Sequence, residues 1–229
     1  VGARLLGRVN PVFAHLTSLD GRADATVDGA RVPLVSPARG AVARGRFELG
    51  GMRVRPSGLL GELLALGGLP LEGLQPLRVT GMDFAVRDGR IEYDGLVLTF
   101  GETFELIFRG SVGFDDTLDL AVSVPVRVAL LERFGVRGPV ADYARLLSGL
   151  RVEIPLAGTR LAPRLDLGKV DLRPLIQRAV ELLLIEQAAR TLREVVGAGG
   201  PASRPAEAPD TQPRERTPLD LIFDILRPR

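Results

Sequence analysis

The side chains that most often perform catalysis are few in this sequence, and they do not form a known catalytic pattern. His15 is the only histidine and there is no cysteine, which excludes thiol chemistry, disulfides and a zinc site built from cysteines or several histidines. A nucleophile elbow needs a glycine two residues before its serine, but Arg109 stands there for Ser111 and Arg55 for Ser57. His15 is therefore more simply a packed or solvated side chain than a catalytic base.

The remaining candidates for chemistry also have simpler structural explanations. Gly168-Lys169 lacks the upstream glycine of a phosphate-binding loop and is followed by Val170. The carboxylates that could form an acid–base pair stand among turn residues, where aspartate is favoured by backbone geometry: Asp88, Asp94, Glu102, Asp115 and Asp116. A glycosidase-like pair depends on a separation in space that spacing alone does not give. We expect no catalytic residue, no metal ligand, no cofactor and no enzyme activity.

Composition excludes two further classes of function. Hydrophobic residues make up 45% of the 229 positions and charged residues 25%, with a net charge of +2, which is typical of a folded globular chain. Acidic and basic residues alternate without a basic stripe, so we expect no nucleic-acid partner. The sequence contains no run of about 18 apolar residues, the length that a membrane-spanning helix needs. Because the chain begins at Val1, we expect a segment of a longer protein whose signal or anchor lies upstream.

The clearest structural signal is an apolar–polar alternation from Leu77 to Pro125. Met82, Phe84 and Val86 alternate with polar or small residues, and four more such runs follow, separated by turn residues such as Asp88-Gly89 and Asp94-Gly95. Period-two alternation in successive runs is typical of a β-meander with one apolar and one polar face. An earlier hairpin is expected between Leu19 and Leu34, with its turn at Asp28-Gly29.

Helical segments complete the expected fold. Ser57 is placed to begin a helix that ends at Gly67-Gly68, and Arg127 to Leu150 predicts a helical insertion. Apolar residues at helical spacing predict a long amphipathic helix from Asp171 to Val196. The fold class is therefore α+β: a strongly curved antiparallel sheet, a meander or groove, with a long C-terminal amphipathic helix and short helical insertions.

Three regions are expected along the chain. Residues 1–196 form the β-domain, and residues 197–216, rich in Gly, Ala, Pro and charge, form a disordered linker. Residues 217–229 form a short helix that begins at Thr217-Pro218. One face of that helix is apolar and is a candidate surface for protein partners: Leu219, Ile222, Phe223 and Leu226.

A sheet with one apolar face allows two interpretations. The simpler one is an ordinary α+β core, in which the helices 57–66 and 171–196 cover the face. The other is a groove in which lipid acyl chains cover part of the face. The candidate groove-lining residues are Phe84, Val86, Ile91, Tyr93, Leu98, Phe100, Leu106, Phe108, Leu120 and Val122.

Several segments resemble the C-terminal region of AsmA-like proteins, a family related to AsmA and TamB. The similarity covers about residues 9–196 and rests on strand patterns rather than catalytic motifs. It is carried by residues 9–14 (VNPVFA), 19–22 (LDGR), 32–34 (VPL), 77–126, 154–159 (IPLAGT) and 162–165 (APRL).

The resemblance implies a function and a location. AsmA-like proteins belong to the envelope of Gram-negative bacteria, are usually anchored in the inner membrane by an N-terminal helix, and form β-sheet grooves thought to carry phospholipids toward the outer membrane. It thus implies a periplasmic domain that shields phospholipid acyl chains, takes part in lipid transport and outer-membrane assembly, and associates with the membrane through an upstream region.

Two other functions remain open. The chain could be an envelope assembly or scaffold module that binds protein partners through the terminal helix and exposed strand edges. A secreted carbohydrate-binding or carbohydrate-degrading β-domain is less favoured, because the chain has no tryptophan to stack on sugars.

Overall fold

The computed structural model describes residues 2–14, 19–135, 147, 149–175, 177–178, 181–182 and 185. The chain divides into two compact units, Val1–Asp171 and Leu172–Arg229. The first unit contains the whole sheet. The described positions between 173 and 185 in the second unit are helical, while the remainder of the predicted helix to Val196, the linker 197–216 and the terminal segment 217–229 lie outside the described residues.

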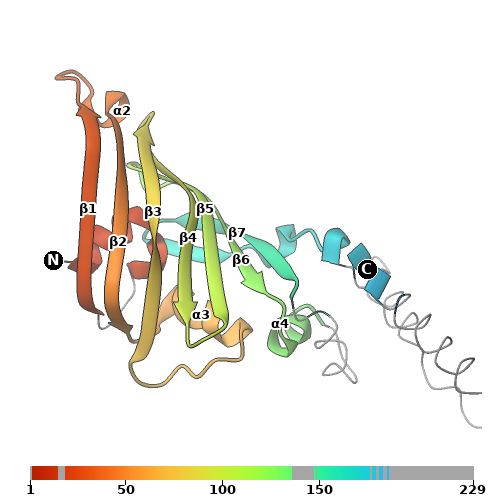
Figure 1. Ribbon diagram of the computed structural model, residues 1–229. Coiled ribbons are helices and arrows are strands. Elements are labelled where there is room, and N and C mark those ends of the chain that lie inside the picture. The colour runs from red at the N-terminus through yellow and green to blue at the C-terminus, as the bar shows by residue number, and fades with distance from the viewer. Residues whose placement is uncertain are drawn as a thin grey trace, which may run out of the picture. The chain divides into compact units, whose positions relative to one another are not determined.

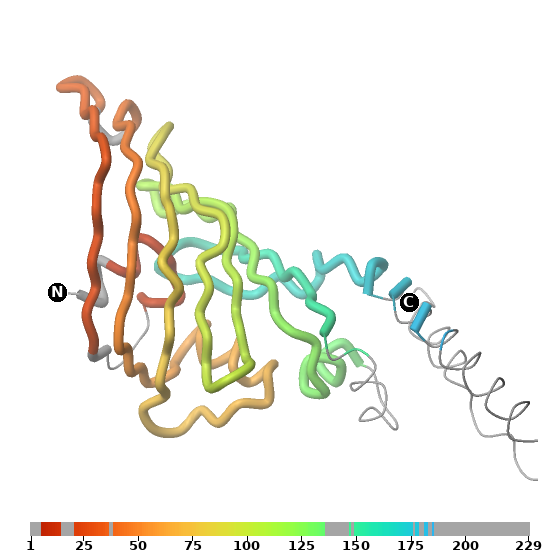
Figure 2. The backbone as a smooth tube through the Cα atoms, viewed as in Figure 1, coloured from red at the N-terminus to blue at the C-terminus, as the bar shows by residue number. Residues whose placement is uncertain are grey.

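The first unit is built on one open antiparallel sheet of eight strands, in which each strand pairs with the next along the chain (Figure 1). The strands are β1 (Leu19–Arg31), β2 (Val42–Val54), β3 (Gln75–Arg87), β4 (Arg90–Phe100), β5 (Phe104–Gly113), β6 (Leu118–Pro125), β7 (Arg151–Thr159) and β8 (Ala162–Leu165). The sheet twists and bends, so that β7 and β8 run nearly crosswise to β1 and β2 in Figure 2. The predicted meander is thereby confirmed.

Alternation along the strands gives the sheet two chemically different faces. We call the face that carries Phe47, Leu98 and Phe108 the inner face, since these side chains are buried. The other face, the outer face, carries Arg46, Asp83 and other exposed charged residues. The register follows this division, because residues opposite one another on neighbouring strands point to the same side of a sheet.

Short helices lie on the inner side of the sheet (Figure 1). They are α1 (Gly2–Val9), the 3-10 turn η1 (Pro11–Phe13), α3 (Gly58–Leu66) and, beyond the end of β6, α4 (Val128–Arg133). Two other short segments, α2 (Pro37–Gly40) and η2 (Leu167–Lys169), lie in loops. The predicted helix after Ser57 is confirmed, with Ser57 as N-cap and Gly67 as C-cap.

Leucines from α3 and residues of η1 fill the space against the inner face. Leu60, Leu63 and Leu64 of α3 are at most 1% exposed, and so are Val12 and Phe13 of η1. The end of α3 lies directly against β5, because a Cβ atom added to Gly67 would come within 2.3 Å of the Phe104 ring. Much of the inner face is therefore an ordinary core.

Two predicted turns are wrong. The chain does not reverse at Asp28-Gly29, because β1 continues to Arg31 and pairs with β2, with a register shift between Val27 and Gly29. Asp94-Gly95 likewise lies inside β4, where the register with β5 shifts between Asp94 and Leu96. In both places the Asp-Gly pair coincides with a local irregularity of the strand pairing, and at Gly95 the backbone takes a positive φ of +90°, as it would in a turn.

Candidate functional site: the inner face and its open end

The ten candidate groove residues all lie on the inner face, but their exposure differs. Seven of them are at most 5% exposed and belong to the core: Tyr93, Leu98, Phe100, Leu106, Phe108, Leu120 and Val122. The other three, Phe84, Val86 and Ile91, are half-buried. The register brings them together, because Phe84 lies opposite Tyr93 and Val86 opposite Ile91.

Exposure of the inner face falls from one end of the sheet to its middle. At the end near the β1–β2 connection, Ala43 pairs with Val86 and Val86 with Ile91, and all three are half-buried. Toward the middle, Leu96 pairs with Phe108 and Phe108 with Val122, and all three are 0% exposed. The protein's own side chains therefore fill the middle of the inner face and leave this end accessible on β2 to β4, whereas Val112 of β5, opposite Ile91, is 1% exposed.

The inner face is also uncovered along β1. Ala23, Ala25 and Val27 lie opposite Leu49, Phe47 and Gly45 of β2 and so point to the inner side. Unlike the β2 residues, all three are exposed. We call the exposed and half-buried inner-face residues of β1 to β4 the open strip: Ala23, Ala25, Val27, Ala30, Ala43, Phe84, Val86 and Ile91.

A glycine shapes the centre of this strip. Gly45 lies opposite Phe84, and a Cβ atom added to Gly45 would come within 2.8 Å of the Phe84 ring. The ring therefore packs directly on the β2 backbone and stays low against the sheet. The same added atom would lie 2.1 Å from the Thr26 carbonyl oxygen of β1, so any larger residue at this position would disturb the β1–β2 pairing as well as the ring.

The Asn10–Tyr93 pair marks the boundary between the strip and the filled core. Asn10 is 0% exposed and Tyr93 5%, and the Asn10 Nδ2 donates a hydrogen bond of 2.9 Å to the Tyr93 Oη. The Asn10 Oδ1 accepts a second hydrogen bond from the Val12 backbone N–H and so caps η1. Burial raises the pKa of the Tyr93 phenol, which keeps this site neutral.

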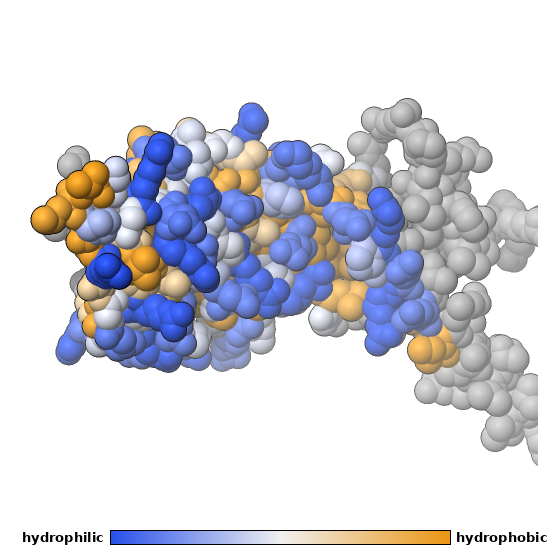
Figure 3. Space-filling view, turned by 90° about the horizontal axis from the view of Figure 1, so that it is seen from above, coloured by the Kyte–Doolittle hydropathy of each residue, from blue (hydrophilic) through white to orange (hydrophobic). Residues whose placement is uncertain are grey.

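The loop that joins β1 and β2, residues 32–41, is called the tip loop here. It carries exposed apolar side chains, with Leu34 fully exposed and Val35 83% exposed. Seen from above in Figure 3, apolar atoms gather at the left, over this end of β1 and β2. The tip loop is not among the functional residues expected from the sequence, although it lies in a stretch from Gly29 to Phe47 without any acidic residue.

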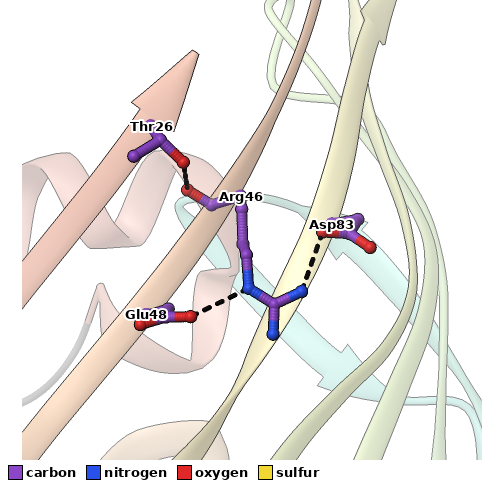
Figure 4. Close-up of polar contacts among 4 residues, drawn as sticks. All are labelled: Thr26, Arg46, Glu48 and Asp83. Atoms are coloured by element: carbon purple, nitrogen blue, oxygen red, sulfur yellow. Dashed lines mark hydrogen bonds and ion pairs between the residues drawn. The ribbon is translucent and has the colours of Figure 1, made fainter. Parts of the chain in front are cut away.

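The outer face is polar and its charges are largely paired. Arg46 bridges Glu48 and Asp83, with N–O distances of 2.8 and 3.1 Å (Figure 4). Arg87 pairs with Glu92, and Arg109 with Asp94 at 2.9 Å. These ion pairs flank a shallow hollow of about 770 Å³.

The other sequence candidates for chemistry have structural roles where they are described. Asp115 accepts hydrogen bonds from the Thr117 Oγ1 and backbone N–H, and these bonds lower the pKa of the Asp115 carboxyl. Ser111 accepts a hydrogen bond of 2.7 Å from the Arg90 Nε. Lys169 pairs with Asp166 at 3.1 Å. His15 and the partner-binding candidates Leu219, Ile222, Phe223 and Leu226 lie outside the described residues.

The described part of the chain contains neither a metal-binding cluster nor a membrane-spanning helix. No group of three or more histidine, cysteine, aspartate or glutamate residues is placed there to hold a metal ion. No helix in that part has both the length and the apolar character needed to cross a membrane.

Comparison with known proteins adds no relative. No family model, no curated protein and no solved structure matches this chain.

Proposed function

We propose that this chain is a non-enzymatic, AsmA-like domain of the bacterial envelope that shields phospholipid acyl chains against its open strip. The observation that carries the proposal is the gradient of exposure along one apolar face. A core needs no accessible end, yet Phe84, Val86 and Ile91 are half-buried and Val27 is 58% exposed. Acyl chains that lie along these residues would remove from water the apolar surface of the lipid and that of the protein.

In this proposal the groove is shorter than the ten candidate residues suggested. The filled middle of the sheet, with Leu98 and Phe108, serves as a rigid floor, and only the open strip contacts lipid. Burial of about five methylene groups contributes about 4 kcal/mol, which corresponds to a dissociation constant of about 1 mM. The strip would therefore hold a lipid briefly, as a transfer path requires, rather than as a permanent ligand.

The proposed context follows the resemblance of the sequence. The domain would act in the periplasm, on a protein anchored in the inner membrane, and would contribute to lipid transport and outer-membrane assembly. Its mechanism is the shielding of apolar surface along a path, without the making or breaking of bonds.

Transfer of fluorescent phospholipid between donor and acceptor vesicles tests the proposal. The purified chain should accelerate transfer, and Val86→Asp should abolish the acceleration because a carboxylate on the strip excludes acyl chains. Leu74→Asp is the matched control, since Leu74 is 44% exposed and precedes β3 at the opposite end of the sheet. Equal transfer by wild type and Val86→Asp would refute the proposal.

A second candidate function, the binding of a protein partner, is favoured by the edge of the sheet at β1. Among the described residues, β1 pairs only with β2, so the other edge of this 13-residue strand offers its N–H and C=O groups to an added strand. Thr26 faces β2, since its hydroxyl donates to the Arg46 carbonyl, so the N–H of the preceding residue, Ala25, lies on the free edge. Replacing Ala25, an exposed residue of β1, by proline would weaken the binding of such a partner.

A further inference from the structure

We infer that the tip loop docks on the surface of an anionic lipid bilayer. The loop lies at the same end of the sheet as Ala43 and Val86 of the open strip. Arg31 and Val42 pair at the base of the loop, and the next residue, Ala43, pairs with Val86. The loop would place that end of the strip at a membrane. In this respect the inference rests on the proposed function, although surface binding itself requires only the loop.

The apolar part of the loop projects into solvent. Leu34 is 101%, Val35 83% and Val32 62% exposed, relative to a free residue. Single exposed apolar residues are common on protein surfaces, but three within four positions at a protruding hairpin end form a patch. Such residues enter the boundary between headgroups and acyl chains when they meet a bilayer.

The loop keeps its shape without help from these side chains. The Ser36 carbonyl accepts hydrogen bonds from the backbone N–H groups of Arg39 and Gly40, at 3.1 and 3.0 Å. Pro33 packs against Gly40, where an added Cβ atom would come within 2.5 Å of the proline ring. Leu34 and Val35 take no part in these contacts. The needs of folding therefore do not explain why the two apolar side chains are exposed.

The charges around the loop complement an anionic surface. Arg31, Arg39 and Arg44 are exposed, and none of them forms an ion pair with a described residue, in contrast to Arg46. Asp28 is the nearest acidic residue before them in the sequence and Glu48 the next after them. Arginines near a negatively charged bilayer each strengthen binding about fivefold.

The size of the patch favours a bilayer over a folded protein. Stable protein interfaces bury about 800 Å² and about 20 residues on each partner, which is far more than one loop with three apolar side chains. Insertion into a bilayer requires no complementary surface, because the lipids rearrange around the inserted residues.

Vesicle flotation tests the inference. The full chain should float with vesicles of phosphatidylcholine and phosphatidylglycerol and lose most binding with phosphatidylcholine alone or at high salt. Leu34→Asp should weaken binding at least about tenfold, and Arg39→Gln about fivefold. Leu74→Asp, the matched control at the other end of the sheet, should bind as wild type does. Since Leu34 is fully exposed, its replacement leaves the fold intact.

A labelled cysteine gives a second, independent reading. The chain has no cysteine, so Leu34→Cys and Leu74→Cys each carry a single environment-sensitive fluorophore. Anionic vesicles should shift the emission of the Leu34→Cys conjugate to shorter wavelength and leave that of Leu74→Cys unchanged. Equal flotation of wild type and Leu34→Asp, or no flotation of wild type, would overturn the inference. So would self-association that Leu34→Asp abolishes without any vesicle binding by wild type.

The same experiments separate this inference from the proposed function. Loop-dependent flotation without transfer of phospholipid supports membrane docking and refutes lipid shielding. Transfer that Val86→Asp abolishes and Leu34→Asp leaves unchanged, together with loop-independent flotation, supports lipid shielding and refutes docking through the tip loop.

Discussion

The Asn10 side-chain amide donates a hydrogen bond of 2.9 Å to the Tyr93 phenol, across 83 positions of sequence. This bond ties the N-terminal segment to β4 in the row of the sheet that contains Phe84 of the open strip, since Tyr93 lies opposite Phe84. Both groups are buried in an otherwise apolar region. The pair therefore anchors the N-terminal segment against the buried part of the inner face on β4.

Tyr93→Phe is expected to lower the free energy of unfolding by about 1–3 kcal/mol, because the buried Asn10 Nδ2 loses its acceptor. Chemical denaturation measures the change. The control is the same substitution in an Asn10→Ala background, where it should cost much less. An equal cost in both backgrounds would show that the hydrogen bond is not the cause.

Stability should fall in alkaline solution because burial raises the pKa of Tyr93. The folded state retains a proton that the unfolded state releases above its ordinary pKa of about 10, so the contribution is complete below that pH and declines above it. The decline is about 1.4 kcal/mol per pH unit. Denaturation midpoints near pH 8 and pH 11 should diverge more for wild type than for Tyr93→Phe. Identical pH dependence would contradict this assignment.

The gradient of exposure predicts that valine-to-alanine substitutions lower the free energy of unfolding by different amounts at two places on the inner face. Val122→Ala should lower the free energy of unfolding by about 2–3 kcal/mol, because Val122 is 0% exposed and a cavity remains. Val86→Ala should cost less than about 1 kcal/mol, since Val86 is half-buried. Equal costs in urea denaturation would mean that the strip is as closed as the core.

Gly110→Ala should prevent folding or destabilise the protein severely. Gly110 has a φ of +117°, and an added Cβ atom would lie 2.1 Å from the Asp119 carbonyl oxygen of the neighbouring strand. Gly51→Ala is the matched control: Gly51 also has a positive φ, +60°, but nothing lies within 4 Å of the added atom. We expect it to cost about 1–2 kcal/mol, measured as thermal stability by circular dichroism.

The sheet could be predicted from the sequence because its strands alternate strictly. Phe104, Leu106 and Phe108 already indicate which side of β5 is buried. The two Asp-Gly pairs could not be assigned in the same way, because a turn and a β-bulge need the same residues. Which one forms depends on whether a partner strand continues alongside, and that is a property of the tertiary structure.

The extent of the open strip could not be predicted from the sequence. Phe84 and Phe108 have the same kind of neighbours along the chain, yet one is half-buried and the other 0% exposed. The difference arises from the position of α3 and η1 across the sheet, which local patterns do not encode. The inner-face position of Ala23, Ala25 and Val27 could have been predicted from the sequence. These residues alternate with Asp24 and Thr26, which is typical of a strand with one small apolar face.

The most direct test of the central claim is photo-crosslinking from the open strip. A photoreactive phenylalanine analogue at Phe84 should form adducts with a short-chain phospholipid dissolved as monomers, and the same analogue at Leu74, the exposed control, should form few. Val86→Asp should remove the adducts at Phe84. Adducts of equal yield at both positions, or none at Phe84, would contradict the claim that this end of the inner face receives lipid.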